Sequence, residues 1–557
     1  LHIGEDGRSL WGRSDYTGGF GKPYRLYYAV EFDRTPAGFG TFRDAQTTAG
    51  DRRISSSGKK EQLGAFLRFD TRAEGAGTVQ MKVAVSFHSV ERAKASLARE
   101  IPSFDYDVVR DAAAAAWRNT LGAFDATGGT EEERRIFYSA VFHAHIMPRD
   151  RTGEFARLDP AVPMWDDHYA IWDTWRTLFP LLALVRPDVV RGTVQSFIER
   201  QRVDGWVSDT FVGGSNRSQE QGGNAVDMVI ADAHARQVPG IDWPAAYGVM
   251  KHNAERRRLG PLWDEPGNTS QAPVPYRAQG WIPAGTMSTS MSLEYSYNDF
   301  AVAQVAAALG HTDDARRYSE RSRQWTQLWN PDSQHDGFKG FIMSKQADGQ
   351  WIDIDHRKYS GSWKAYLYES NPWTYSYFAP HQVARLVSLM GGPARFTERL
   401  EHAFEKGYID VFNEPAFLVP QLFHWVGRPD LAAKWLKRIT REKFTLQGYP
   451  GDDDSGAMSS YYIFAKLGFF PNAGQDTWLL HGSAFDRVRL RRPGHAPLLI
   501  TRSGKGLYVA GVALDGKAVE RSWLRHAELQ AATTLHFAMS ETPTDWARRA
   551  PAPPSLP

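Results

Sequence analysis

The sequence predicts a multidomain protein of α and β structure. An N-terminal antiparallel β-sandwich, a helical linker, an (α/α)6 toroid and C-terminal β-strands are expected to follow one another. Three observations support this order: β-branched and aromatic runs fill the first 90 residues, helical periodicity dominates from about residue 130, and strand-like runs return near residue 477. A length of 557 residues is sufficient for several domains. The predicted boundaries are 1–90, 91–129, 130–476 and 477–557.

The sandwich is predicted from runs at residues 24–32, 64–69 and 79–87. Apolar residues partly alternate there, and clusters of Gly, Ser and Asp separate the runs. Residues 91–129 change in composition to Ala, Glu and Arg, with five consecutive Ala before Trp117, which is typical of a helical linker.

The toroid is predicted from about a dozen segments of helical periodicity between residues 130 and 468. An α-solenoid would require a fixed repeat period, and the sequence shows none. The connections at 204–224 and 261–285 are longer than ordinary loops, so we expect them to form walls of a functional site. The tail from 477 is predicted to form strands, with apolar runs at 498–501, 506–510 and 534–537.

Composition excludes several classes of function. The chain has 66 Lys+Arg against 64 Asp+Glu, a net charge of +2, so nucleic acid is not an expected partner. It has no Cys, which excludes disulfides, thiolate metal sites and a cysteine nucleophile. The sequence contains no run of about 18 apolar residues, so it predicts no membrane-spanning helix. The start at Leu1 carries no signal segment and is expected to be processed or truncated. The high aromatic content, with 19 Trp, 22 Tyr and 30 Phe, predicts either core filling or a lined cleft.

Three carboxylate segments carry the chemical signal. The first is Trp-Asp-Thr-Trp-Arg at 172–176, where Asp173 could accept sugar hydroxyls beside tryptophan rings; a structural pair of Asp173 with Arg176 is an equal alternative. The second contains Glu369 among aromatic residues including Trp373, which favours a protonated general acid over a solvated glutamate.

The third segment is Gly-Asp-Asp-Asp-Ser-Gly at 451–456. In an extended loop Asp452 and Asp454 project to one side, and a helix beginning near Ser455 favours ionised carboxylates, as a general base requires. A solvated acidic turn is the alternative. An EF-hand is rejected, because Gly456 occupies the fifth position and Ile463 the twelfth.

Other motifs are weaker or absent. Glu414, in Asn-Glu-Pro at 413–415, is either a carboxylate at a helix N-terminus or a sugar or metal contact. His143 and His145 point to opposite sides of a helix, and the chain has no H-E-x-x-H, P-loop or Gly-x-Ser-x-Gly motif. Separated carboxylates with aromatic loops on a helical toroid favour glycoside hydrolysis, in which one acid protonates the leaving oxygen and the other activates water or attacks carbon.

These segments resemble, in order and over nearly the whole chain, glycoside hydrolase family 92, the calcium-dependent exo-acting α-mannosidases. The most specific matches are Trp-Asp-Thr at 172–174 and Gly-Asp-Asp-Asp-x-Gly-x-Met-Ser at 451–459. Further matches occur at 83–87, 100–107, 137–143, 231–233, 369–383, 413–415 and 482–485. The family architecture of β-sandwich, linker helices and (α/α)6 catalytic toroid agrees with the fold predicted from the patterns.

The resemblance implies an inverting mechanism on glycans with terminal α-mannose. Glu369 matches the catalytic acid and Asp454, supported by Asp452, matches the base. Calcium is implied as the cofactor that binds the terminal mannose. Trp172, Asp173 and Arg176 would hold that sugar, and Glu414 would lie at the leaving-group side or ligate the metal. The aromatic residues beside these carboxylates, including Trp373, are expected to line the pocket.

Several positions depart from the family pattern. Asn413 replaces a His of α-1,2-specific members, which argues against that specificity, and Asp227 stands where many members carry His and is expected to reshape the pocket. The first part of the family's sandwich is expected to be missing before Leu1. The alternatives are a mannosyl-phosphodiester hydrolase of the same family, a glucoside-cleaving (α/α)6 enzyme and a non-catalytic carbohydrate-binding protein. A secreted, periplasmic or cell-surface location is expected; the oligomeric state is not predicted.

Overall fold

The computed structural model describes residues 1–16, 23–58, 60–72, 77–168, 170–216, 221–257, 275–360 and 365–557. Two compact units are present. The smaller comprises residues 1–118, 151–166 and 212–215, and the larger comprises residues 119–150, 167–211 and 216–557. Part of the predicted wall loop 204–224 and much of 261–285 lie outside the described residues.

The smaller unit contains two antiparallel sheets, with strand orders β1-β2-β3-β7 and β5-β4-β6. Helix α1 packs against β3 and β7, and its N-terminus is capped by the Ser89 side chain. Ala29, Ala93 and Leu97 form the core of this contact. The elements are β1 (His2–Ile3), β2 (Ser9–Tyr16), β3 (Tyr24–Phe32), β4 (Gly38–Arg43), β5 (Gln46–Ala49), β6 (Leu63–Arg68), β7 (Met81–Ser86), α1 (Val90–Glu100) and α2 (Tyr106–Leu121), which continues into the larger unit.

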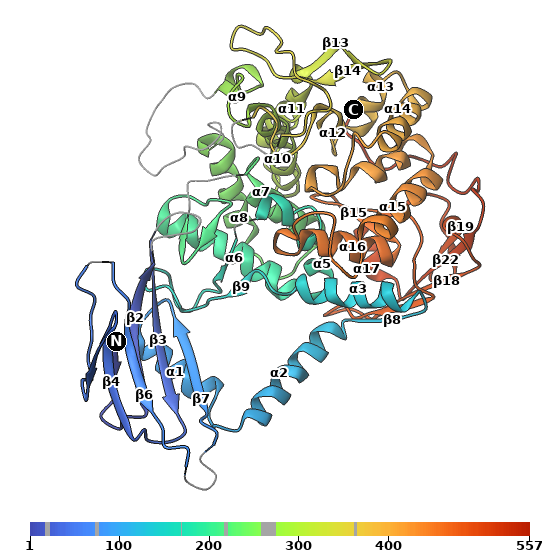
Figure 1. The fold of residues 1–557 in the computed structure, drawn as a ribbon. Coiled ribbons are helices and arrows are strands. Elements are labelled where there is room, and N and C mark those ends of the chain that lie inside the picture. Colours follow the sequence, from blue (N-terminus) through green and yellow to red (C-terminus); the bar gives the residue numbers. More distant parts are fainter. Residues whose placement is uncertain are drawn as a thin grey trace. The chain divides into compact units, whose positions relative to one another are not determined.

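Helices dominate the larger unit (Figure 1). They are α3 (Glu131–His143), α4 (Ile171–Thr174), α5 (Leu178–Val185), α6 (Pro187–Asp204), α7 (Ala225–Ala235), α8 (Trp243–His252), η1 (Asn253–Arg257), α9 (Pro275–Gln279), α10 (Ser288–Ala308), α11 (Thr312–Arg321), η2 (Gln324–Leu328), α12 (Pro372–Tyr375), α13 (Val383–Leu389), α14 (Pro393–Glu405), η3 (Glu414–Ala416), η4 (Val419–Val426), α15 (Pro429–Lys443), η5 (Asp454–Gly456), α16 (Ala457–Leu467) and α17 (His526–Ala531).

Strands complete the larger unit, with a six-stranded sheet of order β20-β19-β22-β18-β17-β8, a three-stranded sheet β15-β16-β21 and a hairpin β13-β14. The strands are β8 (Phe124–Thr127), β9 (Arg149–Asp150), β13 (Trp329–His335), β14 (Phe338–Ile342), β15 (Phe469–Asn472), β16 (Thr477–Leu480), β17 (Arg487–Leu490), β18 (Leu498–Ser503), β19 (Tyr508–Leu514), β20 (Lys517–Ala518), β21 (Trp523–Arg525) and β22 (Thr534–Ser540). Strand β10 (Trp165–Asp166) belongs to the smaller unit, and β11 (Phe211–Val212) and β12 (Ser215–Asn216) each have one residue in either unit.

The predicted order of an N-terminal β-sandwich, a helical domain and C-terminal strands is confirmed. Local expectations differ at two places. The end of the predicted helical linker is a strand, β8, which pairs with β17 far along the chain. The helix predicted from 171 is broken into α4 and α5, because Pro180 has no N–H for a continuous helix to bond to the carbonyl of Arg176.

Helix α10 lies in the core of the helical unit, where it packs against α7 and α11. Nearly every side chain of α10 is buried, including Glu294 and Asp299, and small Ser and Ala residues allow neighbours to approach on several sides. Acidic residues on a helix with almost no exposed face need partners inside the protein.

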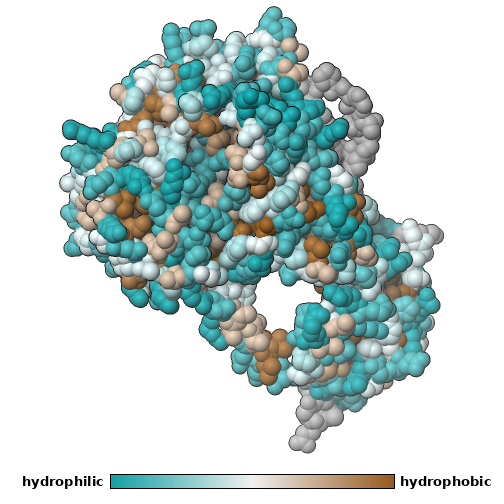
Figure 2. All heavy atoms as spheres, turned by 180° about the vertical axis from the view of Figure 1, so that it is seen from behind, coloured by the Kyte–Doolittle hydropathy of each residue, from teal (hydrophilic) through white to brown (hydrophobic). Residues whose placement is uncertain are grey.

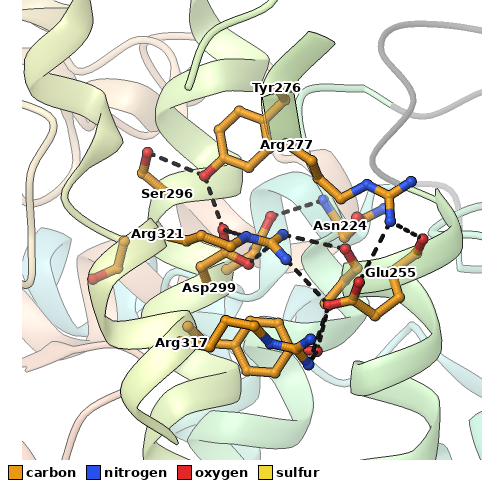
Figure 3. A network of polar contacts seen from close by, with 12 residues as sticks. Asn224, Glu255, Tyr276, Arg277, Ser296, Asp299, Arg317 and Arg321 are labelled. Carbon is orange, nitrogen blue, oxygen red and sulfur yellow. Dashed lines mark hydrogen bonds and ion pairs between the residues drawn. The ribbon is translucent and has the colours of Figure 1, made fainter. Parts of the chain in front are cut away.

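Asp299 belongs to a group of charged and tyrosine side chains that contact one another (Figure 3). We call this group the paired network; its members are Glu255, Asp299, Arg277, Arg317, Arg321, Tyr276 and Tyr318. Arg321 contacts both carboxylates, at 3.1 Å from Asp299 and 3.2 Å from Glu255. The hydroxyl groups of Tyr276 and Tyr318 also donate to these carboxylates. The network therefore joins η1, α9, α10 and α11.

The face of the molecule in Figure 2 is mostly hydrophilic, with apolar residues in small patches. Within the described part of the chain, no helix combines the length and apolar character that crossing a membrane requires.

Candidate active site

Three carboxylates from distant parts of the sequence meet in the helical unit. Asp173 lies on α4, Glu414 begins η3 and Asp454 begins η5. One oxygen from each lies within 4.8 Å of the other two. Asp173 and Glu414 are buried, and Asp454 is partly buried. We call these three residues the acidic centre.

The loop that carries Asp454 has an unusual backbone. Asp454 and Ser455 both have positive φ, 42° and 60°, a region that non-glycine residues seldom adopt and that is often found at functional sites. The segment is therefore not the extended loop expected from the sequence. Upstream, a side chain at Gly451 would collide with the carbonyl of Phe412, so glycine allows this loop to approach the segment before Glu414.

Asp453, between the two predicted catalytic aspartates, has a structural contact. Its Oδ1 accepts the N–H of Ser459 in the first turn of α16, at 2.8 Å. The Ser459 hydroxyl donates to the Tyr449 hydroxyl, which also contacts His143 Nδ1 at 3.0 Å. This chain of contacts ties the loop to α3 and α16, and so fixes the place of Asp454.

The acidic centre holds its carboxyls in an environment that disfavours charge. Burial, and then the charges of Asp454 and Glu369, raise the pKa of Asp173 well above its usual value. Burial followed by Asp173 and Asp454 does the same to the pKa of Glu414. Burial, with Glu369 and then Asp452, raises the pKa of Asp454 to about 6. This rise is opposite to the shift that a helix N-terminus favours, and it follows from burial and the neighbouring carboxylates.

The oxygens of the acidic centre also lack hydrogen-bond donors. Among the described residues, neither oxygen of Glu414 has a hydrogen-bond partner, and the same holds for Asp173 Oδ1. The other oxygen of Asp173 accepts from Gln221 Nε2 at 3.1 Å. Buried carboxylate oxygens that lack hydrogen-bond partners are suitable ligands for a hard divalent cation such as calcium, which prefers oxygen ligands.

Arg176 lies beside the acidic centre but is engaged elsewhere. Its Nη2 forms a 2.6 Å ion pair with Glu294 of α10, and its Nε donates to the carbonyl of Trp172. The guanidinium lies 4.5 Å from the ring centre of Trp175 and 4.8 Å from that of Trp172. The alternative pair of Asp173 with Arg176 is not among the ion pairs of the described residues, where Arg176 has Glu294 as its partner.

Glu369 faces the same centre from the segment before α12. Its charge is close enough to raise the pKa of both Asp454 and Asp173. Glu369 also has a positive φ of 48°, and its Oε2 accepts from Asn413 Nδ2 at 3.0 Å. The same Asn413 amide reaches the hydroxyl of Tyr359 at 3.2 Å. Asn413, which directly precedes Glu414, therefore links the predicted acid to the segment that carries Glu414.

The remaining predicted site residues lie differently. Asp452 is exposed, and its charge contributes to the raised pKa of Asp454. Trp373 is fully buried, with its Nε1 3.2 Å from His335 Nδ1 and its ring packed against Phe341. The ring of Trp373 has no exposed face in this structure, and its place in the lining of a sugar pocket stays a prediction. Asp227 is buried on α7, where it accepts from Asn253 Nδ2 at 2.8 Å.

The sequence patterns missed Glu294 and Gln221. Glu294 is the charge partner of Arg176, and Gln221 is a hydrogen-bond donor to Asp173. A signal for Glu294 existed, since an acid within a helix of small and apolar residues needs a buried partner. Gln221 carried no such signal. Its approach depends on Gly222, where a side chain would collide with the indole of Trp172.

Comparison with known proteins decides the family. The model of the glycosyl hydrolase family 92 catalytic domain matches residues 92–541, and that of the family's N-terminal domain matches residues 1–86. The chain belongs to glycosyl hydrolase family 92. This family consists of glycoside hydrolases, and the family predicted from the motifs is thereby confirmed.

A curated protein is similar to this chain over most of its length. An uncharacterized secreted glycosidase of Arthroderma benhamiae is 29% identical over an alignment of 533 residues that covers 89% of this chain and 65% of that relative. The chain thus spans slightly less than two thirds of that relative's length.

Solved family 92 structures share the fold. A family GH92 inverting mannosidase from Bacteroides thetaiotaomicron VPI-5482 has a TM-score of 0.85 and 23% identity, covering 100% of this chain and 78% of its own. A family GH92 α-mannosidase from Bacteroides thetaiotaomicron in complex with mannoimidazole has a TM-score of 0.86 and 24% identity, covering 100% and 76%.

Proposed function

We propose that this protein is an exo-acting, inverting α-mannosidase that depends on calcium and releases terminal mannose from the α-mannosides of glycans. The observation that carries the proposal is the convergence of Asp173, Glu414 and Asp454, with Glu369 facing them. Two similar solved structures, an inverting mannosidase and an α-mannosidase bound to mannoimidazole, support mannose as the sugar.

In this proposal Asp454 is the general base and Glu369 the general acid. Asp454 removes a proton from the water that attacks the anomeric carbon, and Glu369 protonates the departing glycosidic oxygen. Two different carboxyls are needed because the water and the leaving group lie on opposite faces of the sugar. Asp452 supports the base through its charge, and the amide of Asn413 orients the carboxyl of Glu369.

Asp173, Glu414 and Asp454 would hold the calcium ion. When bound, calcium would supply positive charge that allows neighbouring carboxylates to be ionised together, and would bind sugar hydroxyls. Trp172 and Arg176 are proposed to hold the terminal sugar, with Arg176 kept in place by Glu294. Asp227 is proposed to affect the pocket indirectly, through α7 and Asn253.

A secreted, periplasmic or cell-surface location is part of the proposal. The similar glycosidase from Arthroderma benhamiae is described as secreted, which supports it. Glycans that carry terminal α-mannose are the proposed substrates.

Proton NMR of aryl α-mannoside hydrolysis tests the function. We expect β-mannose to appear first and then to mutarotate, because a single displacement inverts the anomeric centre. Removal of calcium with a chelator should abolish turnover, and returning calcium should restore it. Initial release of α-mannose would contradict inversion, and activity insensitive to the chelator would contradict the role of calcium. Cleavage of α-glucosides but not α-mannosides would contradict the substrate.

A further inference from the structure

A second charged site lies in the helical unit, in a cavity of about 630 Å³. It is bordered by α3, α15, α16 and the C-terminal sheet, where α16 packs on α3 and α15 packs on β19 (Figure 1). Six cationic side chains line it: Lys434, Lys437, Arg438, Arg441, Lys466 and Arg502. We call it the basic cavity, and it contains none of the residues of the acidic centre.

The carboxylates of the basic cavity do not balance this charge. Its lining contains three of them, Glu133, Glu442 and Asp486. Each already serves a cation: Glu133 pairs with Lys466 at 2.8 Å, Glu442 with Arg438 at 3.1 Å, and Asp486 with Arg502 at 3.5 Å. Positive charge therefore exceeds negative charge along the cavity wall.

Lys437 is the least compensated of these cations. Its Nζ donates to the carbonyl of Leu507 at 2.7 Å, and no carboxylate of the described residues lies within 4.0 Å of it. Loss of hydration, followed by the charges of Arg502 and Lys466, lowers the pKa of Lys437 to about 7, while the more distant Glu133 opposes this change. The nearby His481 is buried, with a pKa of about 3, and so adds no charge at neutral pH.

The ammonium group of Lys437 is therefore partly buried near two other cations, Arg502 and Lys466. Within the described part of the chain it makes one hydrogen bond, to the carbonyl of Leu507, so it can donate further hydrogen bonds to a ligand. An oxyanion would relieve the repulsion and accept hydrogen bonds from several donors at once, and arginine is well suited to such anions. The cavity volume is in the range of small-molecule sites, so the anion could be free or attached to a sugar.

We propose that the basic cavity binds a phosphate-class oxyanion, with Lys437, Lys466 and Arg502 as its principal contacts. This inference goes beyond the proposed mannosidase activity and does not depend on it. Glu133 and Asp486, which pair with Lys466 and Arg502, would hold these two side chains in position to contact the anion.

Calorimetric titration of the full chain at low salt and pH 6.5 tests the proposal. The probes are inorganic phosphate, glucose 6-phosphate and glucose; a glucose derivative is used because the acidic centre is proposed to bind mannose. We expect phosphate or glucose 6-phosphate to bind with a dissociation constant below about 1 mM, and glucose not to bind. Equal affinity for the two anions would identify the ligand of the basic cavity as a free anion. About tenfold tighter binding of glucose 6-phosphate would identify it as a sugar phosphate.

Matched variants on α15 locate the binding. Lys437→Met should weaken phosphate binding about tenfold or more, since it removes a charged donor. Lys443→Met, on the same helix but outside the cavity and paired with Asp410, should leave it unchanged. Failure of both anions to bind, or equal losses in the two variants, would overturn the proposal.

A second readout separates binding from folding. NMR of ¹³C-methylated lysines should show the Lys437 signal titrating near pH 7 without phosphate and at higher pH with saturating phosphate, because an anion favours the charged form. A Lys437 titration unmoved by saturating phosphate would also overturn the assignment.

Discussion

The helical unit contains two clusters of carboxylates with opposite surroundings. In the paired network, Glu255 and Asp299 meet arginine and tyrosine side chains (Figure 3). In the acidic centre, Asp173, Glu414 and Asp454 meet one another. The residue types are the same, and the difference lies in the partners.

Their pKa values respond in opposite directions. Although burial alone would raise it, the Tyr318 hydroxyl and the charges of Arg321 and Arg317 hold the pKa of Glu255 below its usual value. In the acidic centre, burial and neighbouring carboxylates raise the pKa of every member. Paired carboxylates stabilise the fold, whereas mutually repelling carboxylates need a cation or a proton and so are suited to function.

The largest expected effect is that of Asp454→Asn. Asparagine keeps the shape but cannot accept the proton of the attacking water, so kcat on every α-mannoside should fall about 10²–10⁴-fold. Steady-state kinetics on aryl and disaccharide substrates, with circular dichroism to verify folding, provide the measurement. A folded variant that retains wild-type kcat would show that Asp454 is not the base.

Glu369→Gln should have a smaller and substrate-dependent effect. Disaccharides, whose leaving alcohols need protonation, should be slowed about 10²-fold or more, while activated aryl mannosides should be slowed far less. Comparison of kcat/KM across a series of leaving groups measures this difference. Equal losses on all leaving groups would contradict the acid role. Efficient cleavage of a mannosyl phosphodiester that is insensitive to Glu369→Gln would favour the phosphodiester alternative.

The acidic centre should also cost stability when calcium is absent. With a folded pKa of about 6 and an unfolded pKa of about 4, Asp454 binds its proton more tightly in the folded state. Stability from this group therefore rises as pH falls from 7 toward 4, and its ionisation destabilises the folded state above pH 6. In chelator, Asp454→Asn should be more stable than wild type at pH 7, by up to about 3 kcal/mol.

Urea unfolding at several pH values measures that difference. The advantage of Asp454→Asn should shrink toward pH 4, where the wild-type carboxyl is protonated in the folded state and about half protonated in the unfolded state. An advantage that is absent at pH 7, or that grows as pH falls, would contradict the raised pKa.

Glu255→Gln should give the converse result in the paired network. Loss of this carboxylate removes the charge partner of Arg277 and leaves Arg321 paired with Asp299, and should lower the free energy of unfolding by about 1–2 kcal/mol. The value of kcat/KM should remain within about twofold of wild type, as expected for a change away from the site. A selective loss of activity without loss of stability would break the distinction between scaffold and site.

Much of the fold could be predicted from local patterns. Alternation and helical periodicity located the sandwich, the helices and the terminal strands because they depend on neighbouring residues. Strand β8 could not be found this way, since Phe124–Thr127 is fixed by pairing with β17, far along the chain. The burial of Trp373 could not be predicted for a similar reason, since its hydrogen-bond partner, His335, lies on the unpredicted hairpin β13-β14.

The candidate site was partly visible in the sequence. Asp173, Glu369 and Asp454 stood out because acids adjoin aromatic residues or other acids there, Glu414 gave a weaker signal, and the family resemblance assigned roles to these residues. The convergence of α4, η3 and η5 could not be predicted, because it depends on close approaches such as that of Gly451 to Phe412. The ion pair between Arg176 and Glu294 is likewise a product of packing between distant helices.

Calcium titration by calorimetry tests most directly the claim that the unpaired carboxylates form the functional centre. After chelation and dialysis, we expect wild type to bind one calcium ion, Glu414→Gln to bind at least about tenfold more weakly, and Glu255→Gln to bind as wild type does. No calcium binding by wild type, or equal binding by wild type and Glu414→Gln, would contradict the account.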